Sequence, residues 1–173
     1  MNQNLYERFK SINEWLKFAE TKHTAFIALN GAGIFGVLST FKTLDGICLY
    51  SKGIIILFFS ISIISSIISF IPSLRRVIHY KVYNDEEFKA QKDKINSLYF
   101  GELAMLTAKQ LLEVVKENDQ INSFKKVDSD LADQIIQNSK IALSKYNYFT
   151  FSAWMTLLAI IIGIVNLFLF KAC

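Results

Sequence analysis

Residues 53–74 read GIIILFFSISIISSIISFIPSL. The stretch contains no charged residue, whereas Lys52 precedes it and Arg75 and Arg76 follow it. At 1.5 Å per residue, a helix of this length covers roughly 33 Å, enough to cross a hydrocarbon core of about 30 Å. The sequence therefore predicts a membrane-spanning helix from Gly53 to Leu74.

Two other uncharged stretches predict further spans. The first is Thr24–Phe41, TAFIALNGAGIFGVLSTF, and the other is Tyr148–Phe170, YFTFSAWMTLLAIIIGIVNLFLF, within residues 146–170. The chain of 173 residues has one proline and seven glycines, so few turn signals interrupt it and helices are favoured over strands. We expect an all-α integral membrane protein with three transmembrane helices, at 24–41, 53–74 and 146–170.

Small and polar side chains within the spans predict helix packing. Ala28, Ala32 and Gly36 recur every fourth residue, and small residues let a second helix approach closely in lipid. Asn30 should face a polar partner or cavity, because an unpaired amide in hydrocarbon is costly. Four serines share one face of the second span, where their hydroxyls either bond a neighbouring helix or meet water when protomers assemble: Ser62, Ser65, Ser66 and Ser69.

The distribution of lysine and arginine predicts the topology. Basic residues are frequent in residues 1–23 and at both ends of residues 75–145, whereas only Lys42 and Lys52 lie between the first two spans. The positive-inside rule then places the N-terminus and residues 75–145 in the cytoplasm of a multi-pass protein, and the C-terminus outside. The net charge of +4 is explained by these flanking bases and requires no nucleic acid.

The segments outside the spans also predict helices. Residues 1–23 form an amphipathic helix that should run straight into the first span. Residues 75–145 form a helical cytoplasmic domain inserted between spans two and three. Thr107 can cap a helix that ends near Lys116, and residues 117–123 form a loop. A last helix should begin near Asp128 or Ser129 and continue into the third span.

The sequence contains no constellation that indicates an enzyme. It lacks a glycine-rich phosphate loop, a GxSxG motif, an HExxH motif and a paired CxxC motif. His23 and His79 have no partner at metal-ligand spacing, so we interpret both as isolated surface histidines. Cys48 and Cys173 would both face outside, as a disulfide or as two unpaired thiols. We expect no catalytic residue, metal or cofactor.

The cytoplasmic side does contain the parts of a small anion site. Four bases lie at span ends on this face: Lys22, Arg75, Arg76 and Lys145. Tyr99 and Phe100 offer rings for stacking, and Gly101 allows close backbone approach to a ligand. Gln134 and Asn138, one helical turn apart, can bond the edges of a base. The alternative interpretation is that the bases are snorkelling anchors and the aromatic residues are core.

Three segments of the chain resemble those of a known family. The first, EWLKFAETKHTAFIALNGAGIFGVLS, Glu14 to Ser39, is similar to the opening of the Pycsar transmembrane effectors. NSLYFGELAMLTAKQLLEVV resembles its central motif at Phe100, Gly101 and Glu102, where aspartate is expected at least as often as glutamate. DLADQIIQNSKIALSKYNYFTFSAWMTLLAI resembles its last helix, and the three segments occur in the family's order.

The resemblance implies an antiphage role and a location in the bacterial inner membrane. In that family a companion cyclase senses infection and makes cyclic CMP or cyclic UMP, and the effector binds the messenger and impairs the inner membrane. It thus implies a cyclic mononucleotide (cCMP or cUMP) as partner, alongside membrane lipid. A homo-oligomer is expected, because three spans cannot line a wide path alone. Other classes stay open: a scaffold that docks a protein partner, a holin-like pore former, or a channel accessory subunit.

Overall fold

The computed structural model describes residues 2–39, 46–71, 81–118, 120 and 123–169, and in these ranges the regular structure is helical. Three long helices are α1 (Gln3–Ser39), α2 (Gly46–Phe70) and α6 (Lys126–Leu169). Between α2 and α6 lie four short ones, which are α3 (Asp85–Gln91), the 3-10 helix η1 (Lys92–Lys94), α4 (Phe100–Leu103) and α5 (Ala108–Asn118). No strand occurs in the described ranges, as an all-α fold predicts.

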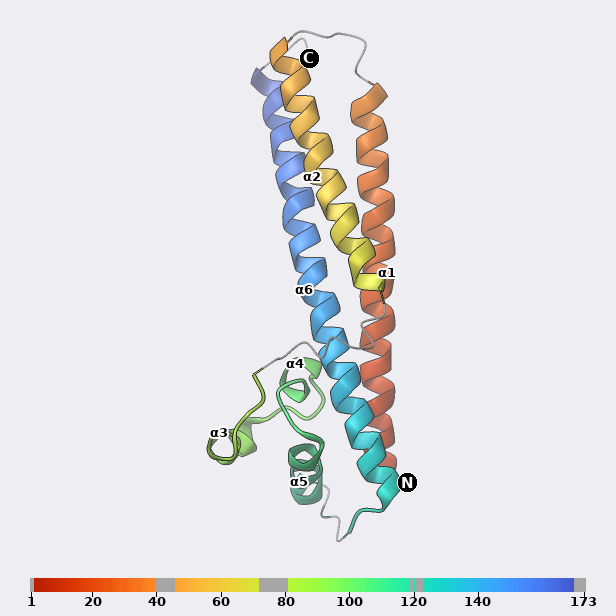
Figure 1. The fold of residues 1–173 in the computed structure, drawn as a ribbon, viewed down its shortest axis with the longest axis vertical. Helices are drawn as coiled ribbons and strands as arrows, with labels where there is room; N and C mark the ends of the chain where they lie inside the picture. Colours follow the sequence, from red (N-terminus) through yellow and green to blue (C-terminus); the bar gives the residue numbers. More distant parts are fainter. Residues whose placement is uncertain (1, 40–45, 72–80, 119, 121–122, 170–173) are drawn as a thin grey trace. The chain divides into compact units, whose positions relative to one another are not determined.

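The chain divides into two compact units. One, the short-helix unit, is Met1–Ala19 with Ser73–Lys145, and the other, the three-helix unit, is Glu20–Pro72 with Tyr146–Cys173. The units divide after Ala19 and after Lys145. The corresponding boundaries in the sequence analysis are those after residue 23 and after residue 145. Both α1 and α6 are single helices that contribute residues to each unit (Figure 1).

The predicted continuity of the long helices agrees with the structure, whereas several helix ends differ. The N-terminal helix runs into residues 24–39 without a break, and the last helix begins at Lys126, two to three residues earlier than predicted. Helix α2 begins at Gly46, well before the predicted Gly53. Residues 72–74 of that predicted span, the link at 40–45 and Cys173 lie outside the described residues, as does the side chain of Cys48.

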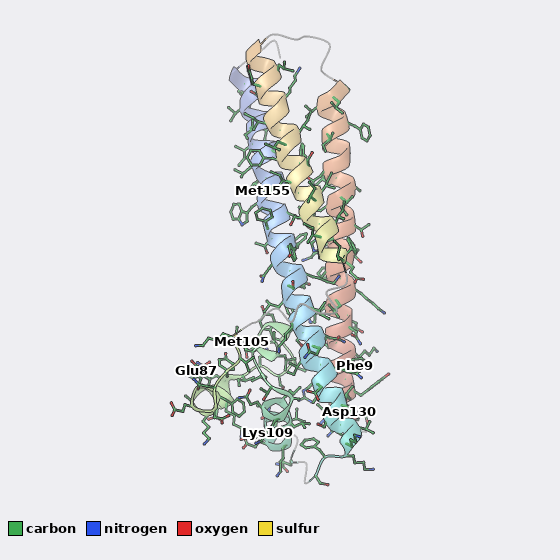
Figure 2. All side chains as sticks on the ribbon, viewed as in Figure 1. Phe9, Glu87, Met105, Lys109, Asp130 and Met155 are labelled. Carbon is green, nitrogen blue, oxygen red and sulfur yellow. The ribbon has the colours of Figure 1, made fainter. Side chains whose placement is uncertain are left out.

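Two helices are long and apolar enough to cross a membrane among the residues described. The most apolar 18 residues within Leu49–Phe70 have a mean hydropathy of 2.4, and those within Lys126–Asn166 have one of 2.0. In the three-helix unit, α1, α2 and α6 run side by side, and side chains fill the space between them (Figure 2). Many large apolar side chains of this unit stay exposed on the chain, including Phe35, Leu57, Ile64 and Phe168.

The short-helix unit folds around a buried apolar core with local caps. Its fully buried side chains include Leu5, Ile12, Leu103, Leu106, Leu111 and Ile135. Thr107 and Gln110 form a reciprocal capping box at the start of α5: the Gln110 N–H donates to Thr107 Oγ1 (3.2 Å) and the Thr107 N–H to Gln110 Oε1 (2.9 Å). The predicted cap at Thr107 is thus confirmed.

Two further sets of contacts order the short helices, one within α3 and one between η1 and α5. Asn84 and Glu87 make a second capping box at α3. The ammonium of Lys92 donates to the carboxylates of Glu113 and Glu117 on α5, which raises the pKa of Lys92. The two ion pairs of Lys92 hold η1 against α5.

Candidate functional site

An aromatic cluster joins α1 to the start of α4 in the short-helix unit. The rings of Trp15 and Phe100 lie with centroids 5.6 Å apart, and those of Tyr99 and Phe100 lie 4.9 Å apart. Phe100 is buried at 4% exposure, whereas Trp15 and Tyr99 are 38% and 45% exposed. Phe100 therefore acts as core, and the two partly exposed rings are the surfaces on which a planar ligand could stack.

Gly101 lets the Tyr99 ring fold back over the backbone. Gly101 is buried, and a Cβ at this position would lie 2.8 Å from Tyr99 Cζ and 3.0 Å from its hydroxyl oxygen. Those distances are far below van der Waals contact, so any side chain here displaces the ring. The predicted role of Gly101 was backbone approach to a ligand; the structure places a tyrosine ring there.

A compact turn positions Tyr99. The Leu98 N–H donates to Asn96 Oδ1 at 3.0 Å, and the Tyr99 N–H donates to the Asn96 carbonyl at 3.1 Å. The carboxylate of Glu102 accepts a hydrogen bond from the Asn96 N–H and closes the turn from its other end. Aspartate, one methylene shorter, would have to make this contact from a closer backbone position.

Helices α1 and α6 are joined by polar contacts within the same unit. Asn138 Nδ2 donates to Asn13 Oδ1 at 2.9 Å, so this predicted base-reading amide bonds another side chain. Gln134, one turn earlier, is exposed. The buried Arg8 donates from its Nη2 to Ser97 Oγ at 3.4 Å, which links α1 to the turn that carries Tyr99.

Asp128 links the start of α6 to the start of α1 by hydrogen bonds. Its carboxylate accepts from the Lys125 N–H at 2.9 Å and from the Asn2 N–H at 2.7 Å. The hydrogen bond from the Lys125 backbone, followed by that from Asn2, lowers the pKa of Asp128 below its ordinary value of 3.8. The interpretation of Asp128 as a helix N-terminal charge agrees with these contacts.

Asp128→Asn is expected to destabilise the full chain at neutral pH by about 1 kcal/mol, the usual size of a helix-cap effect. The folded pKa is lowered, so this stabilisation is present above the unfolded pKa and is lost as pH falls through the folded pKa. Thermal unfolding followed by circular dichroism should therefore separate wild type from variant at pH 7 and bring them together in acid. Asp130→Asn, at an exposed site on α6, is the matched control; a pH-independent difference would contradict this account.

The structure describes two of the four predicted basic residues, Lys22 and Lys145. Lys22 belongs to the three-helix unit, where its ammonium lies 5.3 Å from the Tyr146 ring centroid and 5.1 Å from that of Phe149. Lys145 is the last residue of the short-helix unit and is partly buried. Arg75 and Arg76 lie outside the described residues, as does His79.

The three-helix unit contains a buried network of amide and hydroxyl groups. Asn30 Nδ2 donates to Ser62 Oγ at 2.8 Å, and the Thr156 hydroxyl donates to Asn30 Oδ1 at 2.9 Å. Ser62 Oγ lies 2.9 Å from Thr156 Oγ1 and 2.9 Å from the Ser152 carbonyl, and Ser66 Oγ lies 3.0 Å from Ser152 Oγ. Asn30, Ser62 and Ser66 are thereby brought together, with Ser152 and Thr156 as partners that spacing alone did not single out.

His23 is buried, so its interpretation as a surface histidine is wrong. It has no exposed surface, and its Nε2 lies 2.9 Å from Ser69 Oγ. The rings of Phe70 and Phe149 meet it edge-on at centroid distances of 6.0 and 5.8 Å. The sequence suggested a residue at the membrane boundary, because position 23 directly precedes the uncharged stretch. In the structure α1 continues through position 23, and the His23 side chain contacts Ser69 of α2.

The stripe of small residues on α1 is exposed and, among the described residues, does not pack against another helix of the same chain. Ala28, Ala32 and Gly36 are exposed, and a Cβ at Gly36 would meet no atom within 4 Å. The close approach within the chain is made at Gly33, where a Cβ would lie 2.8 Å from the ring of Phe59. Packing of Ala28, Ala32 and Gly36 against a helix of another copy stays a prediction.

Comparison with known proteins gives one family. The family model described as the Pycsar effector protein domain matches residues 4–171. Searches of curated proteins and of solved structures found no match.

Proposed function

Because the matched domain extends over nearly the whole chain, the chain belongs to the Pycsar effector family, and we propose that it senses cCMP or cUMP and then impairs the inner membrane. The family and the two apolar helices make it a membrane protein with an antiphage effector role. The messenger, the site and the membrane mechanism are our proposal, as is the absence of enzymatic activity.

The continuity of α1 and α6 carries the proposal. Each helix contributes to the short-helix unit at one end and to the three-helix unit at the other. A ligand that binds more tightly to one arrangement of the short-helix unit shifts the chain toward that arrangement. Because α1 and α6 are continuous from one unit into the other, such a shift has a covalent route into the bilayer.

The short-helix unit supplies the ligand site in this proposal. The pyrimidine stacks on the partly exposed rings of Tyr99 and Trp15, with Phe100 and Gly101 holding Tyr99 in place. The exposed amide of Gln134 is available to a base edge, whereas Asn138 would have to exchange its bond to Asn13. Lys145 of the same unit is proposed to neutralise the phosphodiester, together with Arg75 and Arg76, for which the sequence predicts this role.

We also propose three spans, with residues 24–39 of α1 as the third beside α2 and α6. Two observations support this: residues 24–39 carry no charge, and Asn30 is buried in hydrogen bonds to the other two helices. The N-terminus and residues 75–145 are then cytoplasmic, and a homo-oligomer supplies the path. Protease digestion of intact spheroplasts should leave residues 75–145 uncut.

Calorimetry on the purified chain in detergent tests the ligand. We expect saturable binding of cCMP or cUMP, and much weaker binding of cyclic AMP, which carries a larger base. Binding of a cyclic dinucleotide should be measured in the same way, because it tests for a different class of messenger. A protein that binds none of these nucleotides and co-purifies with a protein partner would instead support the scaffold alternative.

Gly101→Ala is expected to weaken nucleotide binding on the order of tenfold, because displacing the Tyr99 ring removes much of its stacking surface. Helix stability should change by less than about 1 kcal/mol, since alanine favours a helix over glycine. Gly31→Ala is the matched control, because a Cβ there meets no atom within 4 Å. Equal affinities for the two variants in calorimetry would refute the role of Gly101.

A further inference from the structure

Helices α2 and α6 are joined by a reciprocal pair of hydrogen bonds that reach the backbone of each helix. The Ser62 hydroxyl donates to the Ser152 carbonyl at 2.9 Å, and the Ser152 hydroxyl donates to the Ser62 carbonyl at 3.0 Å. One turn further along α2, Ser66 Oγ lies 3.0 Å from Ser152 Oγ. A serine side chain is short, so bonds of this kind require the two backbones to lie close together. They fix the register of α2 against α6.

Helix α1 meets this pair through the ends of longer side chains. Asn30 Nδ2 donates to Ser62 Oγ at 2.8 Å, and Asn30 Oδ1 accepts from the Thr156 hydroxyl at 2.9 Å. His23 Nε2 lies 2.9 Å from Ser69 Oγ. An amide or imidazole group bonded to a hydroxyl that can rotate keeps its bond through small displacements of the backbone. These contacts hold α1 in the three-helix unit but fix its register less closely.

The apolar contact between α1 and α2 is flat. A Cβ at Gly33 would lie 2.8 Å from two carbons of the Phe59 ring, so the ring lies directly on the backbone of α1. Ile55 and Ala159 complete the buried cluster around this ring, and Ile34 packs against it. Helices interlock where side chains of one fit between side chains of the other. A ring on a glycine backbone interlocks less, so this contact permits α1 to slide.

The same helix carries contacts from the proposed ligand site. In the short-helix unit, Arg8 of α1 donates to Ser97 Oγ at 3.4 Å. The rings of Trp15, also on α1, and Phe100 lie with centroids 5.6 Å apart. Both partners flank Tyr99, the ring on which the pyrimidine is proposed to stack. A change at Tyr99 therefore reaches α1 directly.

Two contacts in the short-helix unit tie the beginning of α1 to α6. The Asn2 N–H donates to the Asp128 carboxylate, and the Asn13 amide oxygen accepts from Asn138 at 2.9 Å. Both contacts precede Trp15 in the sequence. They anchor the N-terminal end of α1, so a change at Trp15 shifts the part of α1 that follows.

We propose that α2 and α6 stay together as a fixed pair when the protein is activated, and that α1 is the helix that shifts against them. This inference rests on the proposed function, because nucleotide binding supplies the shift and the membrane leak reports it. It adds which of the three helices moves. Gly33 then slides along the Phe59 ring, while the serine bonds between α2 and α6 persist.

Short thiol crosslinks between neighbouring helices test this inference in proteoliposomes that contain an entrapped dye, in a full chain without its two native cysteines. Joining α1 to α2 through Asn30→Cys and Ser62→Cys should abolish the release that cCMP or cUMP causes. Joining α2 to α6 through Ser66→Cys and Ser152→Cys should leave that release unchanged. Each double variant before crosslinking is its own control. Loss of release when α2 is joined to α6, or full release when α1 is joined to α2, would overturn the inference.

Gly33→Leu separates the inference from the ligand. A leucine here collides with the Phe59 ring and displaces α1 from α2, so dye should escape without nucleotide. Gly31→Leu makes the same change where a Cβ meets no atom within 4 Å, and its vesicles should retain dye.

Two outcomes of this second experiment are decisive. If wild type is silent toward both nucleotides and Gly33→Leu still releases dye with α2 crosslinked to α6, the ligand is retired and the moving helix is kept. If Gly33→Leu retains dye with its helicity intact by circular dichroism, or releases it only when α2 and α6 are not crosslinked, the moving helix is refuted.

Discussion

Tyr99→Ala is expected to weaken binding of cCMP and cUMP by about 5- to 150-fold, because stacking of a base on an aromatic ring contributes roughly 1–3 kcal/mol. Tyr99 is the more exposed of the two available rings, at 45%. Phe100 beneath it is buried, so Phe100 and Trp15 remain packed when Tyr99 is removed. Isothermal calorimetry of the full chain in detergent measures the change directly.

Tyr6→Ala is the matched control for Tyr99→Ala. Tyr6 lies on α1 in the same unit and is 48% exposed, so the same group is removed from a similarly exposed position. The control should bind both nucleotides as wild type does. Similar losses in the two variants would mean that Tyr99 acts through general stability, and equal affinity of Tyr99→Ala and wild type would remove it from the site.

Ser62→Ala is expected to destabilise the three-helix unit by about 1–3 kcal/mol, the cost of leaving buried polar groups without a partner. Ser62 is the common partner in its network: its hydroxyl accepts from Asn30 and contacts both Thr156 and the Ser152 carbonyl. Alanine removes these contacts while it leaves the helix backbone unchanged. Thermal unfolding in detergent, followed by circular dichroism, should show a lowered midpoint.

Ser60→Ala makes the same chemical change two residues away on α2. Ser60 is only partly buried, whereas Ser62 has no exposed surface. The control should therefore unfold within about 0.5 kcal/mol of wild type, as substitutions outside such buried networks usually do. A Ser62→Ala protein as stable as Ser60→Ala would show that the network does not hold the three helices together.

The elements of the fold could be predicted wherever one physical signal dominated. Uncharged apolar stretches locate α2 and the second half of α6, and the absence of a turn signal at residue 23 predicts one continuous α1. Helix ends were less predictable. Helix α6 begins at Lys126, earlier than predicted, because Asp128 caps it from inside its first turn and accepts a hydrogen bond from distant Asn2. Helix α2 begins at Gly46, earlier than hydropathy indicates.

The candidate site was predictable only in part, because its contacts are long-range. The rings of Tyr99 and Phe100 were visible in the sequence, but Phe100 is core and its contact with Trp15 crosses from one segment to a distant one. His23 and Thr156 find partners on other helices, which no local spacing reveals. Gly33, rather than Gly36, makes the close approach because the rotation of α1 turns residue 33 toward Phe59.

Release of an entrapped fluorescent dye from proteoliposomes tests the central claim most directly. Vesicles that contain the wild-type chain should retain dye in buffer and release it when cCMP or cUMP is present on both sides of the bilayer. Vesicles with Tyr99→Ala should need a higher nucleotide concentration for the same release. Dye release that is equal with and without nucleotide, or none with either nucleotide, would contradict a membrane effector switched by a cyclic pyrimidine.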